Sequence, residues 1–259
     1  MSPLLSICDL TVGFAPRGGQ EPAGAVLRAL ALELDRGEVL ALVGTSGAGK
    51  SLLAHAILGL LPPDAAVSGD IRFEGRSLDA RTLPALRGRR IALVPQSVTH
   101  LDPLMPVGAQ VRRAARRAGA ADPGAAGFER FGLDPAWRDA HPHALSGGMA
   151  RRVLALAALA GEPDLVIADE PTDHLDPASA AIVLRTLAGI AGRGGGVLLV
   201  THDLVAVLPF ATRVALVRDG RLEGLEPASA FTGAGEGIAS AYGRALWRAL
   251  PQNGFGADA

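Results

Sequence analysis

The sequence of 259 residues is poor in cysteine, and its one thiol, Cys8, excludes a disulfide within these residues. A lone cysteine fits a reducing compartment, and we expect Cys8 to be buried as a small apolar side chain. Long hydrophobic runs are also absent: the apolar run at 153–160 is far shorter than the ~18 residues that a membrane span needs.

An excess of charge of either sign is missing too. Lys and Arg number 25 and Asp and Glu 26, which gives a net charge of −1. This balance argues against a general nucleic-acid binder, so we expect no nucleic-acid partner.

Lysine is almost absent, because every basic residue except Lys50 is an arginine. That lysine lies in a stretch that fits G-x-x-x-x-G-K-[ST] at every fixed position. The predicted strand 38–43 precedes the stretch and the predicted helix 51–61 follows it, as a phosphate-binding loop requires. The predicted ATP-binding residues are Gly44, Thr45, Ser46, Gly47, Ala48, Gly49, Lys50 and Ser51.

The chemistry of a phosphate-binding loop explains these residue types. Glycines let the backbone wrap closely around phosphates, and amides at the start of a helix point at the anionic oxygens. Lys50 supplies a positive charge for the β- and γ-phosphates, and the Ser51 hydroxyl is a ligand for Mg²⁺.

A second motif is the apolar run 165–168, which is followed by Asp169 and Glu170. A buried strand that ends in a carboxylate would place Asp169 to hold Mg²⁺ through water, and Glu170 to polarise an attacking water as general base. Taken alone, such a pair could equally be two solvated loop acids. With the phosphate loop upstream, the catalytic interpretation is favoured, and ATP and Mg²⁺ are the expected nucleotide and cofactor.

Strands and helices are predicted to alternate, which indicates a mostly parallel sheet covered by helices. Apolar strand runs disappear between 97 and 145, where the pattern predicts helices at 107–118, 125–131 and 135–140. We expect one domain over residues 1–259. It would consist of a core (1–96 and 146–235), a helical subdomain (97–145), and a closing helix with a frayed tail (236–259).

Further segments resemble those of ABC ATPases. Ser146, Gly147, Gly148 and Met149 resemble the signature loop, and residues 171–176 resemble the D-loop. Gln96, after the predicted strand 91–94, resembles the Q-loop glutamine, and His202 resembles the switch histidine. The motifs occur in the family's order over about residues 4–225. The resemblance implies an α/β P-loop NTPase fold of the ABC ATPase type, with an N-terminal antiparallel β part and a helical subdomain.

The resemblance also implies roles for these residues. Two ATPase subunits would close head to tail on two ATP molecules, so the signature loop would touch the nucleotide of the partner. Gln96 would contact Mg²⁺ or water and report to membrane subunits, and His202 would bond the γ-phosphate. Asp176 would couple the two sites. Phe14 would stack on adenine, unless it is a core residue at a strand end.

The sequence departs from the family pattern at two places. Met149 stands where the signature loop most often has glutamine, which removes a polar contact toward the nucleotide sugar. Asp173 and His174 stand where the D-loop usually has small residues, which could alter the coupling between two sites. Neither change removes Lys50 or the carboxylates, so we expect hydrolysis to persist.

Two stretches resemble the dipeptide, oligopeptide and nickel group of ABC importers: the extended segment 94–108 and the helix 241–251. The run 101–104 and the stretch 250–255 favour the nickel or metal-chelate members. The resemblance implies two membrane permease subunits, a second, non-identical ATPase subunit and an extracytoplasmic solute-binding protein. It places the chain at the cytoplasmic face of a bacterial inner membrane. An exporter, a lipoprotein-release ATPase and a non-transport ABC ATPase remain alternatives.

Overall fold

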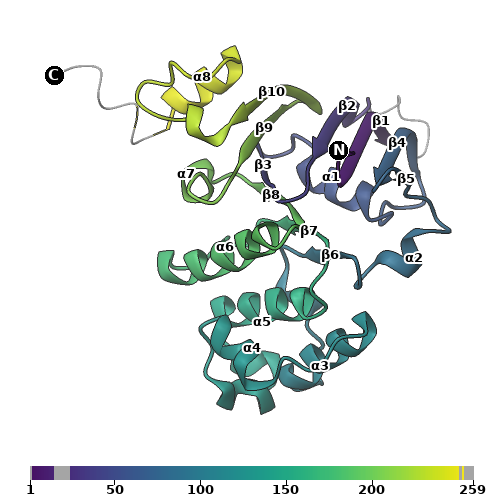
Figure 1. Ribbon diagram of the computed structural model, residues 1–259, viewed down its shortest axis with the longest axis vertical. Coiled ribbons are helices and arrows are strands. Elements are labelled where there is room, and N and C mark those ends of the chain that lie inside the picture. The colour runs from purple at the N-terminus through teal and green to yellow at the C-terminus, as the bar shows by residue number, and fades with distance from the viewer. Residues whose placement is uncertain (1, 15–23, 251–252, 254–259) are drawn as a thin grey trace. The chain divides into compact units, whose positions relative to one another are not determined.

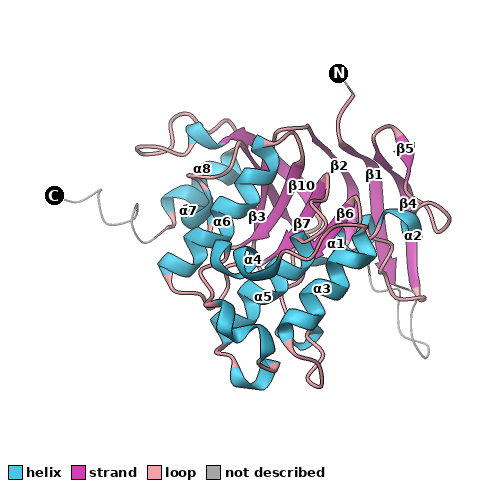
Figure 2. Ribbon diagram, turned by 60° about the horizontal axis from the view of Figure 1, so that its bottom comes forward, coloured by secondary structure: helices cyan, strands magenta, loops and turns pink. Residues whose placement is uncertain are grey.

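The computed structural model describes residues 2–14, 24–250 and 253 (Figures 1 and 2). The chain divides into two compact units, which are described one at a time. The first takes its described residues from 1–34, 39–78 and 201–259, and the second comprises 35–38 and 79–200. Most of the Gly- and Pro-rich stretch 13–24 and of residues 252–259 lies outside the described residues.

An antiparallel sheet of order β2-β1-β4-β5 forms part of the first unit, as predicted for the N-terminal region. Its strands are β1 (Leu5–Phe14), β2 (Leu27–Leu34), β4 (Ala65–Phe73) and β5 (Arg76–Ser77). In β1 the buried residues alternate with more exposed ones, so one face packs into the core. Cys8 lies on the other face and is exposed, so the expectation that it is buried was wrong.

The first unit also contains β3 (Val39–Gly44), which pairs in parallel with β9 (Arg213–Arg218), and β9 pairs antiparallel with β10 (Arg221–Pro227). Every residue of β3 is buried. Its helices are α1 (Lys50–Ile57), α7 (Leu204–Val207) and α8 (Ala241–Arg248), with a short 3₁₀ turn, η4 (Ala228–Ala230).

Helix α1 is shorter than the predicted 51–61, and its end has a clear cause. Gly59 has a positive φ of 59°, and the Leu60 amide donates back to the His55 carbonyl oxygen over 2.8 Å. A left-handed glycine with this backward hydrogen bond is a common way for a helix to end. The following residues therefore leave the helix before Pro62, the residue at which the sequence pattern predicted the end.

The closing helix α8 is anchored by a buried carboxylate from β10. Glu226 is 3% exposed, and its two oxygens accept hydrogen bonds from the amides of Ala239 (3.0 Å) and Ser240 (2.7 Å). The Ser240 hydroxyl oxygen in turn accepts from the Gly243 amide and caps the helix. This cap places the start of the helix at Ala241.

The second unit holds three parallel strands, β6 (Ile91–Val94), β7 (Leu165–Asp169) and β8 (Gly196–Thr201), of which the last residue of β8 falls in the first unit. Its larger helices are α3 (Val107–Ala118), α4 (Gly124–Arg130), α5 (Gly147–Leu159) and α6 (Pro177–Gly192). The shorter ones are α2 (Leu83–Leu86), η1 (Val98–His100), η2 (Pro135–Asp139) and η3 (Pro142–Ala144). The parallel strands with their helices confirm the predicted α/β class.

Helices α3, α4 and α5 lie together in the second unit (Figure 1). Helix α3 coincides with the predicted 107–118, whereas the predicted helix 135–140 is a 3₁₀ turn that the Asp134 carboxylate caps. Phe128 of α4 and Phe131, which directly follows this helix, are both buried. Among the described residues, no helix combines the length and the apolar character that crossing a bilayer requires.

Candidate functional site

The phosphate loop of the first unit leaves β3 and turns directly into α1. Gly44 ends the strand so close to β9 that a Cβ at this position would lie 2.1 Å from the Val217 carbonyl oxygen. Gly47 and Gly49 have positive φ angles of 81° and 91°, a region that favours glycine. The glycines of the motif are therefore required by the geometry of the loop.

The charged and hydroxyl groups of the loop lie where the sequence predicts. Lys50 is buried and its ammonium group donates to the carbonyl oxygens of Gly44 (2.8 Å) and Thr45 (3.1 Å). Ser51 follows in the first turn of α1. Residues 45–47 are exposed, so the surface of the loop is open to a ligand while the lysine is held along it.

Phe14 is half-buried at the end of β1, beside Thr11 and Gly13 in the lining of a shallow hollow. A hydrogen bond from the Val26 amide to the Val12 carbonyl oxygen links this strand end to the start of β2. Gly49 of the phosphate loop packs against Leu27. Phe14 therefore belongs to the same part of the first unit as the loop, and its stacking on adenine stays a prediction.

His202 also lies in the first unit, directly after β8, and its side chain is exposed. The next residue, Asp203, caps α7 by accepting a hydrogen bond from the Ala206 amide, and its own amide donates to the Thr201 hydroxyl oxygen. His202 therefore lies in a short turn that is held by the hydrogen bonds of Asp203 to Thr201 and Ala206.

The two carboxylates of the second unit lie at the end of β7. Asp169 is 5% and Glu170 8% exposed, so both are buried rather than solvated loop acids. The Glu170 amide donates to the Val200 carbonyl oxygen of β8 over 2.9 Å. Glu170 has a positive φ of 46°, which is strained for a residue with a side chain and is typical of functional positions.

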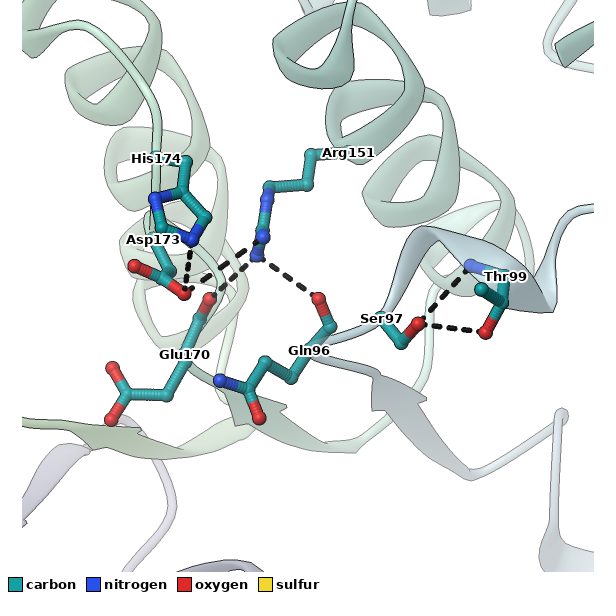
Figure 3. Close-up of polar contacts among 7 residues, drawn as sticks. All are labelled: Gln96, Ser97, Thr99, Arg151, Glu170, Asp173 and His174. Atoms are coloured by element: carbon teal, nitrogen blue, oxygen red, sulfur yellow. Dashed lines mark hydrogen bonds and ion pairs between the residues drawn. The ribbon is translucent and has the colours of Figure 1, made fainter. Parts of the chain in front are cut away.

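Gln96 is exposed and follows β6. Figure 3 shows its side chain on the same side as that of Glu170, while the backbone carbonyls of both face Arg151. Arg151, from α5, donates to the Gln96 carbonyl oxygen at 3.0 Å and to the Glu170 carbonyl oxygen at 3.3 Å. Arg151 was not predicted from the sequence, because nothing in the local pattern marks a residue that donates to two backbone carbonyls.

The signature loop forms the start of α5. The Ser146 hydroxyl oxygen accepts a 3.2 Å hydrogen bond from the Met149 amide and caps the helix. Gly147 is exposed, and a Cβ there would meet no atom within 4 Å. The first turn of the helix therefore presents free space and backbone amides, a suitable arrangement for an anion.

Asp176 has a local structural role that the sequence analysis did not predict. Its carboxylate accepts a hydrogen bond from the Ser179 amide over 3.0 Å and caps α6. Hydrogen bonds from Ser179, first from its side chain and then from its backbone, hold the pKa of Asp176 below its usual value. Its role in coupling two sites stays a prediction.

The predicted Mg²⁺ ligands have the chemistry that this ion prefers. Asp169 offers a carboxylate, and Ser51 and Gln96 offer neutral oxygens. In the described part of the chain, no three His, Cys, Asp or Glu side chains gather as a metal site. Mg²⁺ is usually held by one or two carboxylates together with water and the phosphates of a substrate.

The sequence matches the profile of the family described as "ABC transporter" over residues 27–173. It is 40% identical over 233 residues to the "Uncharacterized ABC transporter ATP-binding protein YejF" of Escherichia coli K12, covering 84% of this chain and 44% of that protein. It is 38% identical to the "Oligopeptide transport ATP-binding protein OppD" of Mycobacterium bovis, covering 86% of this chain and 38% of that protein. The "Dipeptide transport ATP-binding protein DppD" of Bacillus subtilis is 36% identical, and the match covers 86% of this chain and 70% of that protein. The chain thus spans less than half the length of the first two relatives.

Solved structures share the fold. The dimeric structure of MJ0796, described as "a Bacterial ABC Transporter Cassette", has a TM-score of 0.77 and 26% identity, covering 86% of this chain and 98% of that one. A second structure of MJ0796, a post-hydrolysis state bound to ADP and Pi, has a TM-score of 0.76 and 25% identity, with the same coverage. The matched family profile, the relatives and the order of the motifs agree: the chain belongs to the ABC transporter family.

Proposed function

We propose that this chain binds ATP and, with Mg²⁺, hydrolyses it to drive transport through partner permeases. The observation that carries the proposal is the formed phosphate loop: glycines fixed by positive φ angles, with the buried Lys50 lying along them. A loop of this kind binds the phosphates of a nucleotide through amides and one cation.

In the proposed reaction a water oxygen attacks the γ-phosphorus, the bond to the ADP oxygen breaks, and Glu170 accepts the proton of the water. Lys50 and the loop amides stabilise the negative charge on the phosphates. His202 orients the γ-phosphate and the water. Mg²⁺, held by Ser51, Asp169 and Gln96, would neutralise charge on the β- and γ-oxygens.

Two ATPase subunits would complete each site in this proposal, one giving the phosphate loop and the other the signature loop. The start of α5 supports this, because Gly147 is exposed and leaves open space for a γ-phosphate from outside the chain. The relationship to a cassette solved as a dimer supports it as well. We propose a non-identical second ATPase subunit and a position at the cytoplasmic face of a bacterial inner membrane.

The second unit offers a place for a permease segment. A cavity of about 510 Å³ lies beside the chain that follows Gln96. It is bordered by His100 and Met105 from that segment, by Pro95 just before Gln96, and by Arg113 and Arg117 from α3. A permease segment seated in it would touch the residues that follow the Q-loop glutamine. Residues 97–145 would then act as the helical subdomain that the sequence predicts.

Short peptides are the substrate class that we propose for the assembled importer. The names of the relatives from M. bovis and B. subtilis refer to oligopeptide and dipeptide transport. The sequence pattern favoured nickel or a metal chelate, and these names give that preference no support. A solute-binding protein outside the membrane would select the solute, so the choice would be made there and in the permeases.

Purification of the Glu170→Gln variant from its native membranes with MgATP tests this proposal. We expect two multi-span permeases and a second ATPase to co-purify, and the associated solute-binding protein to bind peptides rather than nickel chelates. Permeases that lack a solute-binding protein would favour the exporter or lipoprotein-release alternative. Soluble partners alone would contradict transport and favour a non-transport ABC ATPase.

A further inference from the structure

Arg151 contacts three functional segments of the second unit at once (Figure 3). One guanidinium nitrogen donates to the Gln96 carbonyl oxygen at 3.0 Å and to the Glu170 carbonyl oxygen at 3.3 Å. The other lies 3.9 Å from a carboxylate oxygen of Asp173. The side chain is only 12% exposed, so these contacts are partly shielded from water.

The backbone that Arg151 holds is strained on both sides of Asp173. Glu170 and His174 have positive φ angles of 46° and 58°. Such angles persist only where contacts with the surrounding structure hold the backbone in place. The Glu170 carbonyl oxygen accepts from Arg151 and also, over 3.3 Å, from the Asp173 amide. Arg151 therefore supplies part of the contact set that keeps the turn in its strained form.

The carboxylate of Asp173 offsets the positive charge of the partly buried Arg151 guanidinium. A guanidinium with little solvent needs a nearby negative charge as well as hydrogen-bond acceptors. Asp173 provides the charge, and His174 lies 3.4 Å from the same carboxylate oxygen with its ring exposed. A planar guanidinium serves several acceptors at fixed angles, which a lysine ammonium on a flexible stem does not reproduce.

We propose that Arg151 is a positioning residue that ties the Q-loop to the catalytic turn, with Asp173 as its charge partner. A displacement of the chain at Gln96 is then passed to the backbone of Glu170 through one side chain. This gives a physical route by which movement at the permease surface changes the position of the general base. The proposal rests on the ATPase function proposed above, because it assigns that base to Glu170.

Arg152 provides a matched control on the same helix. Its guanidinium donates to the carbonyl oxygens of Phe131 (3.1 Å) and Gly132 (2.7 Å), at the end of α4, and to that of Gly148 at 3.4 Å. Removing either arginine deletes hydrogen bonds from α5, yet only Arg151 contacts Gln96 and Glu170. The pair therefore separates loss of helix packing from loss of positioning.

The test compares Arg151→Ala, Arg151→Lys, Asp173→Ala and Arg152→Ala in the assembled complex. We expect Arg151→Ala to lower kcat at least tenfold with the KM for ATP and the binding of ATP unchanged. Arg151→Lys should recover only part of kcat. Adding Asp173→Ala to Arg151→Ala should lower kcat little further. Arg152→Ala should lower the melting temperature with a much smaller loss of kcat. A kcat for Arg151→Ala within twofold of wild type, or an equal loss for Arg152→Ala, overturns the proposal.

Amide hydrogen exchange provides a readout that does not depend on activity. We expect Arg151→Ala to speed exchange at residues 96–99 and 170–176 together, and Arg152→Ala to speed it at 128–133 instead. Unchanged exchange at both segments in Arg151→Ala overturns the positioning role. If the wild-type complex does not hydrolyse ATP, the proposed function fails, and exchange alone decides whether Arg151 holds the two segments.

Discussion

The ammonium group of Lys50 donates a 2.8 Å hydrogen bond to the carbonyl oxygen of Gly44, six residues earlier in the chain. The lysine thus folds along its own loop and is held there by the backbone carbonyls of Gly44 and Thr45. A bound nucleotide would exchange these carbonyl contacts for stronger, charge-assisted bonds to phosphate oxygens.

Lys50→Ala should therefore weaken nucleotide binding at least tenfold, because the site loses the cation that would contact the β- and γ-phosphates. Titration with a fluorescent ATP analogue measures the affinity. His55→Ala, an exposed position on the same helix, is the control and should bind like wild type. An unchanged affinity in Lys50→Ala would remove this lysine from the site.

Two glycines in different motifs should respond to alanine in opposite ways. At Gly44 the new Cβ would lie 2.1 Å from the Val217 carbonyl oxygen, so Gly44→Ala should destabilise the fold by about 1–3 kcal/mol. At Gly147 it would meet no atom within 4 Å. Gly147→Ala should keep or raise the melting temperature and still lose ATPase activity, because the methyl group occupies the space for the partner's γ-phosphate.

Thermal unfolding and ATPase assays of the two alanine variants check this prediction. Gly44→Ala with wild-type stability would contradict the close packing of β3 on β9. Full activity in Gly147→Ala would contradict the role of the signature loop in a second nucleotide site.

Glu226 should make stability depend on pH. Burial works to raise its pKa, but hydrogen bonds from Ala239 and Ser240 and the nearby charge of Arg244 outweigh it, and the pKa lies below its usual value. A carboxyl with a lowered folded pKa stabilises the protein fully above its unfolded pKa of about 4.3, and the contribution is lost as the pH falls through the folded value.

Glu226→Gln should accordingly cost about 1–3 kcal/mol near pH 7, since two bonds to a charged acceptor are weakened. The difference from wild type should shrink as the pH falls below about 4. Chemical unfolding at several pH values measures it. A cost that does not change with pH would show that shape rather than charge anchors α8.

The sequence allowed prediction of the parts of the site that depend on local pattern. The phosphate loop could be predicted because glycine, lysine and serine occur at fixed spacing between a strand and a helix. The strand end at Asp169 was predicted because an apolar run precedes a carboxylate. The antiparallel β part and the helical region after Gln96 were predicted correctly, and α3 matched residue by residue.

The contacts that the sequence could not predict join residues far apart in the chain. Arg151 meets Gln96 across 55 residues, and Glu226 holds the start of α8 across 14. Neither spacing follows a helical or strand period, so no local pattern predicts it. The burial of Cys8 was predicted wrongly, because the preference of cysteine for the interior does not tell which face of β1 it occupies.

The measurement that tests the account most directly is ATP turnover and ATP-dependent association of Glu170→Gln beside wild type in the assembled complex. Loss of the general base should lower kcat by about 10²–10⁴-fold. ATP binding should persist, because Lys50 and the loop glycines are intact, and the two ATPase subunits should stay closed on bound ATP. Turnover at the wild-type rate would contradict the assignment of Glu170, and loss of ATP binding would contradict the separation of binding from hydrolysis.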